Sequence, residues 1–343
     1  MPKREQAVLH VLPHAGGGGD TYVDVLGGMS GYRFERLYVA PKRKPEVAQL
    51  ATTLPDLRQL LRRYDLLHVH GEAAAGMLLP LLALRRSVVT LHGLHLLRRV
   101  SGVRRVAAAM NLRAVLGAAS KTICVSNAEH REVAAVVRPA AMRRTVVVHN
   151  GARIPAETTE AERTNVRREL GLDRSEPIAI WVGSLDERRD PLAVVRAAER
   201  TSTTVLFVGD GPLRSDVERA ASARVHVLGQ RSDVPRLLAA ADFFVLMSER
   251  EGLSFALLEA MAHGLPAIVV DIPENLEAVG DSGLTVPYGD EDATAAALRR
   301  LASDPVERSA LGARARQRVT ALFSADDMIA RTRAVYDDVV ASV

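Results

Sequence analysis

The sequence is almost without cysteine. Cys124 is the single one among 343 residues, so an internal disulfide is excluded. Its surroundings, residues 122–125, form a β-rich run, and we expect a small buried core residue there rather than a nucleophile. Long apolar runs are missing too. The longest, residues 73–84, is too short to cross a bilayer, and the run after residues 1–6 is broken by Pro13, unlike a signal peptide. These absences favour a cytoplasmic protein.

Complete cofactor and metal motifs are also absent. The dinucleotide motif G-x-G-x-x-G would need glycine at Thr21 in one glycine-rich turn and at Arg214 in the other. The pair His68 and His70 stands without a paired cysteine or an H-E-x-x-H motif. Asp290 begins an acidic D-x-D run, but a helix is expected directly after it, so we assign it a capping role. We therefore expect neither a cofactor nor a bound metal.

The two halves of the chain differ in charge. Through Asn150 there are 22 Lys and Arg against 10 Asp and Glu, a balance of +12, and the remainder has 23 against 31, or −8. The basic first half indicates an anionic partner such as a membrane surface, a phosphorylated acceptor or an acidic polymer. A general preference for arginine in the genome would not explain why only one half is basic.

Short β-rich runs alternate with helical stretches in both halves. This pattern predicts an α/β protein built from two doubly wound, Rossmann-like parallel sheets with crossover helices. The polar segment 151–169 indicates the boundary between them. The expected strands are residues 8–12, 66–70, 87–91, 121–125 and 145–148 in the first half, and 178–182, 204–208, 225–228, 243–247 and 267–270 in the second.

Two glutamates, Glu251 and Glu259, stand eight residues apart around the start of an expected helix. The first lies in the loop after an apolar strand and the second on the helix, so both carboxylates can flank one crevice. Between them lie the unpaired backbone N–H groups and the positive dipole end of the helix. N–H groups suit a diphosphate and carboxylates suit hydroxyls, so the segment indicates a site for a sugar that carries a diphosphate.

The segment 251–266 resembles the donor-binding signature of the large retaining glycosyltransferase family 4, which is a glutamate, seven residues and a second glutamate. The similarity extends to nearly the whole chain and is most specific in the second half. The other segments that match in the same order are 182–189, 208–214, 228–230, 233–235 and 283–290, and, more loosely, 67–71, 90–93, 125–126 and 150–151.

The resemblance implies the GT-B architecture, in which two Rossmann-like domains face each other across a cleft. It implies an acceptor-binding domain over residues 1–150, a donor-binding domain over 151–325, and a last helix, 326–343, that crosses back to the first domain. The implied activity is a retaining, metal-independent transfer of a hexosyl-type sugar from a nucleoside-diphosphate sugar. For this family the usual mechanism is front-face attack, in which the leaving phosphate takes the acceptor proton.

The resemblance also implies roles for single residues in the donor site. Glu251 holds hydroxyls of the donor sugar, Glu259 holds the ribose hydroxyls, and Arg189 grips the diphosphate; the alternative is two ordinary helix-start glutamates and a solvated arginine. The loop at Gln230 borders the nucleobase. The complete set of implied donor-binding residues is Gly16, Gly17, Gly183, Ser184, Arg189, Gln230, Arg231, Gly252, Leu253, Ser254, Phe255 and Glu259.

One position departs from the family pattern. Where the family has an arginine directly after the glycine, Ser184 follows Gly183 here, and Arg189 stands where the family has a lysine. The second change is tolerable, because a guanidinium binds phosphate bidentately. The first removes a charge-assisted contact worth about 1.5–3 kcal/mol. Arg188 or Arg231 could compensate for it.

Candidates in the first half are fewer. By resemblance His92, at the end of an expected strand, contacts the donor sugar and is assigned to the catalytic set; a histidine with a structural role is the competing interpretation. Gly16 and Gly17 would let the backbone approach donor or acceptor, and a plain loop is the alternative. Four further histidines are weaker candidates: His14, His68, His70 and His95.

The stretch from His95 to Leu116 carries five arginines among apolar residues. It could form a basic amphipathic helix that lies on an anionic membrane. The alternative is a solvated face beside the acceptor site. The first interpretation would place the protein at the inner face of the membrane.

The family resemblance makes a glycosyltransferase the leading hypothesis. The acceptor would be a carbohydrate, a lipid-linked sugar or a small molecule, in envelope polysaccharide, glycolipid or glycoconjugate biosynthesis, and no nucleic-acid partner is expected. A sugar-nucleotide epimerase is one alternative. A phosphorylase is disfavoured, because the second half has no lysine for a pyridoxal cofactor. A catalytically weak binding or assembly partner is the alternative from a different class, which Ser184 favours and the intact glutamate pair opposes.

Overall fold

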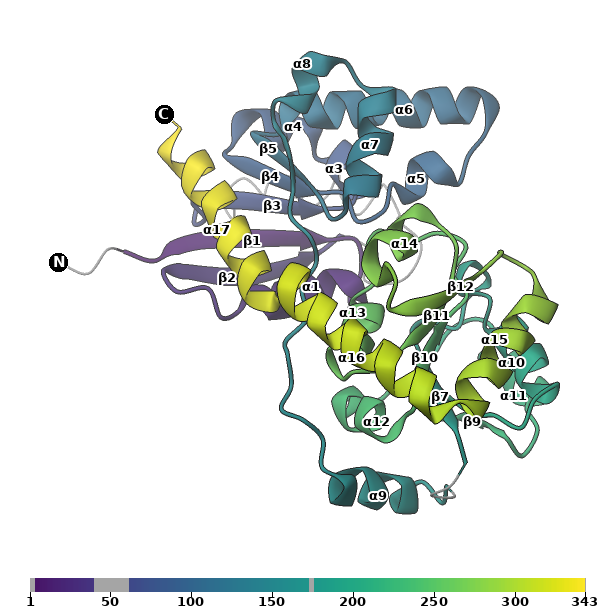
Figure 1. The fold of residues 1–343 in the computed structure, drawn as a ribbon. Helices are drawn as coiled ribbons and strands as arrows, with labels where there is room; N and C mark the ends of the chain where they lie inside the picture. The colour runs from purple at the N-terminus through teal and green to yellow at the C-terminus, as the bar shows by residue number, and fades with distance from the viewer. Residues whose placement is uncertain (1–3, 40–61, 173–175, 343) are drawn as a thin grey trace. The chain divides into compact units, whose positions relative to one another are not determined.

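The structure is a computed structural model that describes residues 4–39, 62–172 and 176–342, and it divides into two compact units (Figure 1). The first unit comprises Met1–Asn150 with Ala325–Val343, and the second comprises Gly151–Ser324. Each unit has a six-stranded sheet in which every paired strand is parallel. The prediction of two doubly wound parallel sheets is therefore confirmed.

The first sheet has the strand order β2-β1-β3-β4-β5-β6. Its inner strands are short runs of buried Val, Leu and Ile, as expected for a sheet covered by helices on both faces. The chain moves from β1 to β2 on one side and then to β3 on the other. The order thus reverses between β1 and β3, which is where open α/β sheets leave a crevice at the carboxyl ends. The strands are β1 (Gln6–Leu12), β2 (Tyr32–Tyr38), β3 (Leu66–His70), β4 (Ser87–Thr90), β5 (Lys121–Cys124) and β6 (Thr145–Val147).

Helices connect these strands, and the last helix of the chain joins them. Helix α17 belongs to the first unit, where it packs beside α1 and brings Tyr336 to the buried face of the sheet. The helices of this unit are α1 (Gly18–Leu26), α3 (Glu72–Met77), α4 (Leu79–Leu84), α5 (His95–Arg98), α6 (Gly102–Ala118), α7 (Asn127–Val136), α8 (Pro139–Met142) and α17 (Ala325–Ala341).

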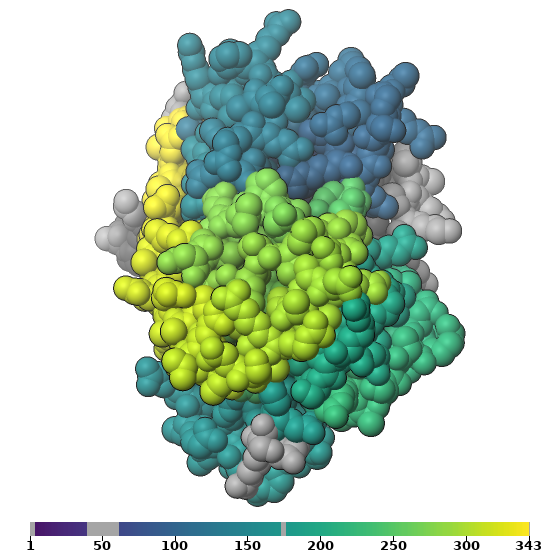
Figure 2. Space-filling view, turned by 45° about the vertical axis from the view of Figure 1, so that its right-hand side comes forward, coloured from purple at the N-terminus to yellow at the C-terminus, as the bar shows by residue number. Residues whose placement is uncertain are grey.

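The second sheet has the strand order β12-β11-β10-β7-β8-β9, and its order reverses between β7 and β10. The strands are β7 (Ile178–Val182), β8 (Thr204–Val208), β9 (Val225–Val227), β10 (Phe243–Leu246), β11 (Ala267–Val270) and β12 (Gly283–Val286). The helices are α9 (Glu160–Glu169), the 3₁₀ turn η1 (Glu187–Arg189), α10 (Pro191–Glu199), α11 (Arg214–Ala220), α12 (Val234–Ala240), α13 (Phe255–Ala262), α14 (Pro273–Val279), α15 (Glu291–Ser303) and α16 (Pro305–Leu322). In Figure 2, residues from about 270 to 320, green to yellow, form one face of this unit.

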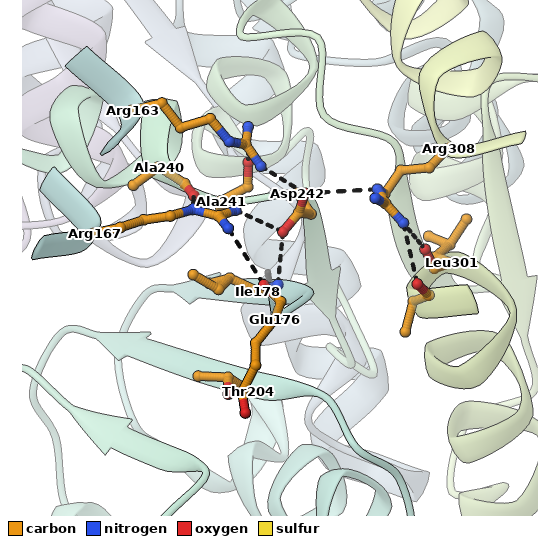
Figure 3. A network of polar contacts seen from close by, with 11 residues as sticks. Arg163, Arg167, Glu176, Ile178, Thr204, Ala240, Ala241, Asp242, Leu301 and Arg308 are labelled. Atoms are coloured by element: carbon orange, nitrogen blue, oxygen red, sulfur yellow. Dashed lines mark hydrogen bonds and ion pairs between the residues drawn. The ribbon is translucent and has the colours of Figure 1, made fainter. Parts of the chain in front are cut away.

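A buried network around Asp242 fastens α9 to the second sheet (Figure 3). Arg163 and Arg167 of α9 each form an ion pair with the Asp242 carboxylate, at 2.5 and 2.7 Å. The same carboxylate accepts a hydrogen bond from the backbone N–H of Ile178 at the start of β7, 2.7 Å away. Arg308 of α16 approaches it at 3.6 Å. The polar segment after Gly151 is thus held onto the second unit by charge-assisted hydrogen bonds.

Two features differ from the sequence-based expectation. The edge strands β2 and β12 were not expected, because β2 alternates polar and apolar residues on a half-exposed edge and β12 is short and starts at a glycine. The stretch from His95 to Leu116 is not one helix. It breaks at residues 99–101 into α5 and α6, and Gly102 starts α6 with a positive φ of 56°.

Two other local predictions, those for Cys124 and Asp290, are confirmed. Cys124 is fully buried on β5. Asp290 is the N-cap of α15, where its side chain accepts a hydrogen bond from the N–H of Ala293 at 2.9 Å. Among the residues that the structure describes, no helix is both long and apolar enough to span a bilayer.

Candidate active site

The switch point of the second sheet brings two loops together at the carboxyl ends of β7 and β10. The loop after β7 contains Gly183 and runs into η1, and the loop after β10 leads to Glu251 and α13. The backbone N–H of Glu249 donates to the carbonyl of Arg188 at 3.0 Å, and Arg188 Nη1 donates to the carbonyl of Arg250 at 2.9 Å. The two loops are therefore fixed to each other before any ligand binds, as a preorganised site requires.

Glycines allow the neighbouring loops to lie equally close. A Cβ atom on Gly209, after β8, would lie 1.8 Å from the carbonyl oxygen of Gly183, and Gly209 also has a positive φ of 140°. A Cβ on Gly183 would lie 2.4 Å from Nη1 of Arg189. A side chain at position 183 would therefore displace the Arg189 guanidinium from the backbone at this point.

Glu251 is buried and faces two arginines. Its Oε1 lies 3.4 Å from Nη1 of Arg188 and 3.8 Å from Nη2 of Arg189. The other two guanidinium nitrogens of Arg189, Nε and Nη1, are buried and have no hydrogen-bond partner in the described structure. A buried donor that lacks a partner costs free energy, and more so when it is charged. An anion that binds here would supply the missing acceptors.

Glu259 lies one turn into α13, behind the loop that starts at Gly252. Ser254 is the N-cap of this helix, and its hydroxyl accepts a hydrogen bond from the N–H of Leu257 at 3.4 Å, so the serine at this position caps the helix. Burial raises the pKa of Glu259 to about 7. No ion pair or hydrogen bond to its carboxylate is present among the described residues. The carboxylate is therefore held in a partly buried position without a partner among the described residues.

The remaining donor-site candidates of the second unit lie at its edge or are already bound. Gln230 and Arg231 are exposed after β9, and Arg231 makes a bidentate ion pair with Asp233, with both distances 2.8 Å. Arg188 is engaged by Glu251 and by a backbone carbonyl. Neither arginine is thus free to supply the positive charge of the family arginine that Ser184 replaces here.

In the first unit, Gly16 and Gly17 follow β1 at the switch point of that sheet. Both have positive φ, 82° and 87°, and a Cβ on either would meet nothing within 4 Å. Gly17 is the N-cap of α1. The two glycines are required by backbone conformation rather than by crowding, and they leave this turn open to solvent.

His92 lies just after β4 in a strained turn. Three consecutive residues have positive φ: His92 at 62°, Gly93 at 109° and Leu94 at 49°. Such a conformation costs of the order of 1–3 kcal/mol for each non-glycine residue and persists only where the surroundings enforce it. The neighbouring residues must therefore hold this turn in place.

Two buried glutamates, which were not predicted from the sequence, enforce that turn. The carboxylate of Glu129 accepts the N–H groups of Gly93 and, at 2.7 Å, of Val125. The carboxylate of Glu72 accepts the N–H groups of Leu96 and, at 3.2 Å, of Leu97. Burial raises the pKa of Glu72 to about 7 and that of Glu129 to about 8. Each carboxylate thus satisfies backbone donors that no secondary structure pairs.

Histidines gather beneath His92. His10 on β1 and His68 on β3 are register partners, and His70 lies two residues further along β3 on the same face of the sheet. Their nitrogens lie within 4.8 Å of one another. The spacing of His68 and His70 was the available sequence signal, but His10 had none, since its partner strand begins more than fifty residues away.

Comparison with known proteins gives matches over both units of the chain. Residues 9–154 match the family model described as "Glycosyltransferase Family 4", and residues 176–304 match the one described as "Glycosyl transferases group 1". An α-maltose-1-phosphate synthase of Mycobacterium tuberculosis is 30% identical over 309 residues, which cover 80% of this chain and 78% of that protein.

Two other curated relatives are similar in sequence, and two solved structures share the fold. An N-acetyl-α-D-glucosaminyl L-malate synthase of Bacillus anthracis is 33% identical over 52% of this chain, and the chain spans about half of it, 49%. A UDP-Gal:α-D-GlcNAc-diphosphoundecaprenol α-1,3-galactosyltransferase of Escherichia coli is 29% identical, over 74% of this chain and 71% of that protein. Sucrose-phosphate synthase of Thermosynechococcus elongatus has a TM-score of 0.81 at 22% identity, over 98% and 100% of the two chains. HepE of Anabaena, solved with UDP-glucose, has a TM-score of 0.79 at 19% identity, over 96% and 99%.

Proposed function

Because the chain belongs to glycosyltransferase family 4 and has the GT-B fold, we propose that it transfers a hexosyl-type sugar from a nucleoside-diphosphate sugar to an acceptor, with retention of configuration. The second unit binds the donor and the basic first unit binds the acceptor. The single observation that carries the proposal is Arg189, a partly buried cation at the switch point of the second sheet, whose Nε and Nη1 atoms are buried and have no partner among the described residues. A diphosphate has the charge and the acceptors that this group lacks.

The proposed chemistry uses charge stabilisation rather than a carboxylate nucleophile. Glu251 is offset by two guanidinium groups within 4 Å, so its carboxylate is held as an acceptor for sugar hydroxyls. Arg189 and the backbone N–H groups between Gly252 and Phe255 stabilise the negative charge that develops on the leaving diphosphate. The leaving phosphate then takes the proton of the attacking acceptor hydroxyl. This chemistry needs no metal, because the protein supplies the positive charge.

Relatives guide the choice of substrates to test. HepE was solved with UDP-glucose, and the E. coli galactosyltransferase is named for a UDP-sugar donor and a diphosphoundecaprenol-linked acceptor. We propose a nucleoside-diphosphate hexose as donor, and a carbohydrate or lipid-linked sugar of envelope glycolipid or polysaccharide synthesis as acceptor.

The test is a binding screen by calorimetry and thermal shift with UDP, GDP, ADP and dTDP and their common sugars, without added metal. We expect one nucleotide to raise the unfolding temperature and to bind with a clear preference, and a Glu259→Ala variant to lose that binding. Binding that requires a divalent cation would contradict the metal-independent mechanism. If no nucleotide binds, the charge-assisted contact that is lost at Ser184 would be the reason, and a partner-binding role without transfer becomes the better explanation.

Helix α6 supports a membrane-bound acceptor. Val103, Val106 and Met110 are 86%, 59% and 61% exposed and lie on one stripe of the helix, and Arg104 and Arg105 are exposed beside them. An exposed apolar stripe flanked by arginines suits the surface of an anionic bilayer. We propose that the first two turns of α6 contact the membrane at which a lipid-linked acceptor is found.

A single charge on this stripe should weaken membrane binding. We expect Val106→Asp to lower partition onto vesicles that contain phosphatidylglycerol by about tenfold, since it removes buried apolar area and adds repulsion. The matched control is Val306→Asp on α16, a 78% exposed valine of the second unit, which should leave partition unchanged. Sedimentation with vesicles at low and high salt measures both variants. Equal binding of wild type and Val106→Asp, or no binding at low salt, would rule out this surface.

A further inference from the structure

His92 is the outer end of a chain of three hydrogen-bonded histidines. Its Nε2 lies 2.8 Å from Nδ1 of His70, and Nε2 of His70 lies 2.9 Å from Nδ1 of His10. His92 is only partly buried, whereas His70 and His10 are buried completely. The chain therefore runs from the open end of β4 into the core, across the switch point between β3 and β1.

The rings in this chain meet edge to edge. The ring centroids of His10 and His70 are 5.2 Å apart with 26° between the planes, and those of His70 and His92 are 5.1 Å apart with 22° between the planes. These separations are little more than the N···N distance plus the two ring radii. Each ring nitrogen thus points along the bond at its neighbour, as in a directed N–H···N hydrogen bond.

The same geometry disfavours a metal at these histidines. Both nitrogens of His70 form hydrogen bonds within the histidine chain. Both nitrogens of His68 form hydrogen bonds outside it, with Tyr336 at 2.6 Å and Thr90 at 2.7 Å. His68 stacks on His70 with centroids 4.4 Å apart instead of turning a nitrogen toward it. Because the nitrogens of His68 and His70 are engaged in these hydrogen bonds, their lone pairs do not converge on one metal ion.

The inner end of the chain is closed. Nε2 of His10 is buried and has no hydrogen-bond partner in the described structure, and the ring of Phe34 packs against this histidine with centroids 5.2 Å apart. None of the described residues there accepts a proton from His10, so the histidine chain is not a path for protons into the core. Burial lowers the pKa of His10 and His70 well below the ordinary value, and that of His92 to about 3, so all three rings are neutral near pH 7.

A neutral imidazole has one donor and one acceptor, so a chain of three has only two consistent arrangements. In one, every proton is on Nε2, and His10 has an N–H buried against apolar atoms without an acceptor. In the other, every proton is on Nδ1, and the unpaired atom of His10 is a lone pair. Buried N–H groups without an acceptor are rarer in proteins than unpaired acceptors. The second arrangement is the favoured one.

We infer that His10 and His70 are positioning residues that hold His92 in the tautomer with its proton on Nδ1. His92 then presents a fixed N–H donor to the substrate, and it does not act as a base. A role for this donor presupposes a sugar or phosphate oxygen at His92, and so rests on the proposed function, whereas the tautomer itself does not. The strained turn held by Glu72 and Glu129 fixes the position of the ring, and the histidine chain fixes its proton.

The tautomer can be measured without substrate. Protein with ¹⁵N-labelled histidine is studied by long-range ¹H–¹⁵N correlation near neutral pH, and the His92 signal is assigned by its loss in His92→Gln. We expect the Nδ1 of His92 to have the shift of a protonated nitrogen and the Nε2 that of a bare one. The opposite pattern in the wild-type protein, or a mixture of both, would overturn the inference whatever the variants do.

Variants then link the tautomer to turnover. His70→Phe and His10→Phe should give a mixture of His92 tautomers and a kcat lower by about three- to tenfold, the effect of one misdirected hydrogen bond. His70→Gln should recover most of the loss, because its amide can donate to Nε2 of His92. The matched control is His68→Phe, which replaces a buried histidine that is not part of the histidine chain. It should leave the His92 tautomer unchanged.

A failure of the proposed function and a failure of the tautomer inference give different results. If the protein has the expected tautomer but transfers no sugar to any acceptor, the proposed function is wrong and the tautomer inference holds. If transfer is observed and His70→Phe changes neither the ¹⁵N pattern of His92 nor kcat, the tautomer inference is wrong and the proposed function holds.

Discussion

Replacing Glu259 with glutamine is expected to make the second unit more stable at about pH 8 and, at the same time, to weaken nucleotide binding. The carboxylate is partly buried on α13, where no described residue forms an ion pair or hydrogen bond with it, and desolvation raises its pKa to about 7. In the unfolded chain the pKa of a glutamate is about 4.3. The ionised form is thus less favourable in the folded protein than in the unfolded one.

The pH dependence of this effect has a definite sign. Between about pH 4.3 and pH 7 the folded state binds more protons than the unfolded state, so stability falls as the pH rises through this window and is constant above it. Above pH 7 the deficit is of the order of 3 kcal/mol. Glutamine does not ionise, so the advantage of Glu259→Gln should be small near pH 4.5 and should grow to its full size by about pH 8.

Binding should change in the opposite direction. A carboxylate can accept both hydroxyls of a ribose, whereas an amide has one acceptor oxygen and no charge. We expect Glu259→Gln to weaken binding of the preferred nucleoside diphosphate by about 10- to 100-fold. Thermal unfolding as a function of pH and calorimetric titration measure the two effects on the same sample.

The matched control is Glu218→Gln, an exposed helical glutamate of the same unit that is paired with Arg214. It should show neither a pH-dependent gain in stability nor a loss of affinity. A Glu259→Gln protein that binds the nucleotide as well as wild type would exclude the ribose assignment. One that is no more stable at about pH 8 would show that the carboxylate has a partner in solution.

The inner framework of both units could be predicted from local sequence, because strands such as 178–182 and 243–247 are short apolar runs bounded by turn residues. Two of the four edge strands, β2 and β12, could not. Residues 32–38 of β2 are all exposed or only partly buried, and no local signal says that this segment pairs with β1 rather than remaining a loop. Both of these strands are specified by a neighbour in space, which the local sequence does not contain.

In the candidate site, too, features set by nearby residues could be predicted, and features set by contacts between distant segments could not. Glu251 and Glu259 were recognisable because they lie close in sequence around one helix start. The histidine chain was not, since the contact of His10 with His70 depends on the register of β1 against β3 across sixty residues. The carboxylates of Glu72 and Glu129 were missed for a related reason. Their role is to accept backbone N–H groups of a strained turn, and that role is visible only once the turn is seen.

Replacing Arg189 with methionine is expected to reduce kcat for sugar transfer by about 10²- to 10³-fold, the usual cost of losing one preorganised donor at a developing negative charge. Methionine keeps much of the apolar stem volume and removes the guanidinium, two of whose nitrogens are buried without a partner among the described residues. The loss should fall mainly on kcat, because the charge on the leaving diphosphate is largest in the transition state.

We expect no neighbouring arginine to compensate for the loss of the Arg189 guanidinium. Position 184 holds a serine, Arg188 is engaged by Glu251 and a backbone carbonyl, and Arg231 is bound to Asp233. Arg189→Lys should recover part of the rate, since it keeps the charge but not the bidentate geometry. The control Arg236→Met, an exposed arginine paired with Glu169, should change kcat by less than about twofold. A kcat for Arg189→Met within threefold of wild type would mean that the diphosphate is stabilised elsewhere, and the switch point of the second sheet would no longer be the site of leaving-group stabilisation.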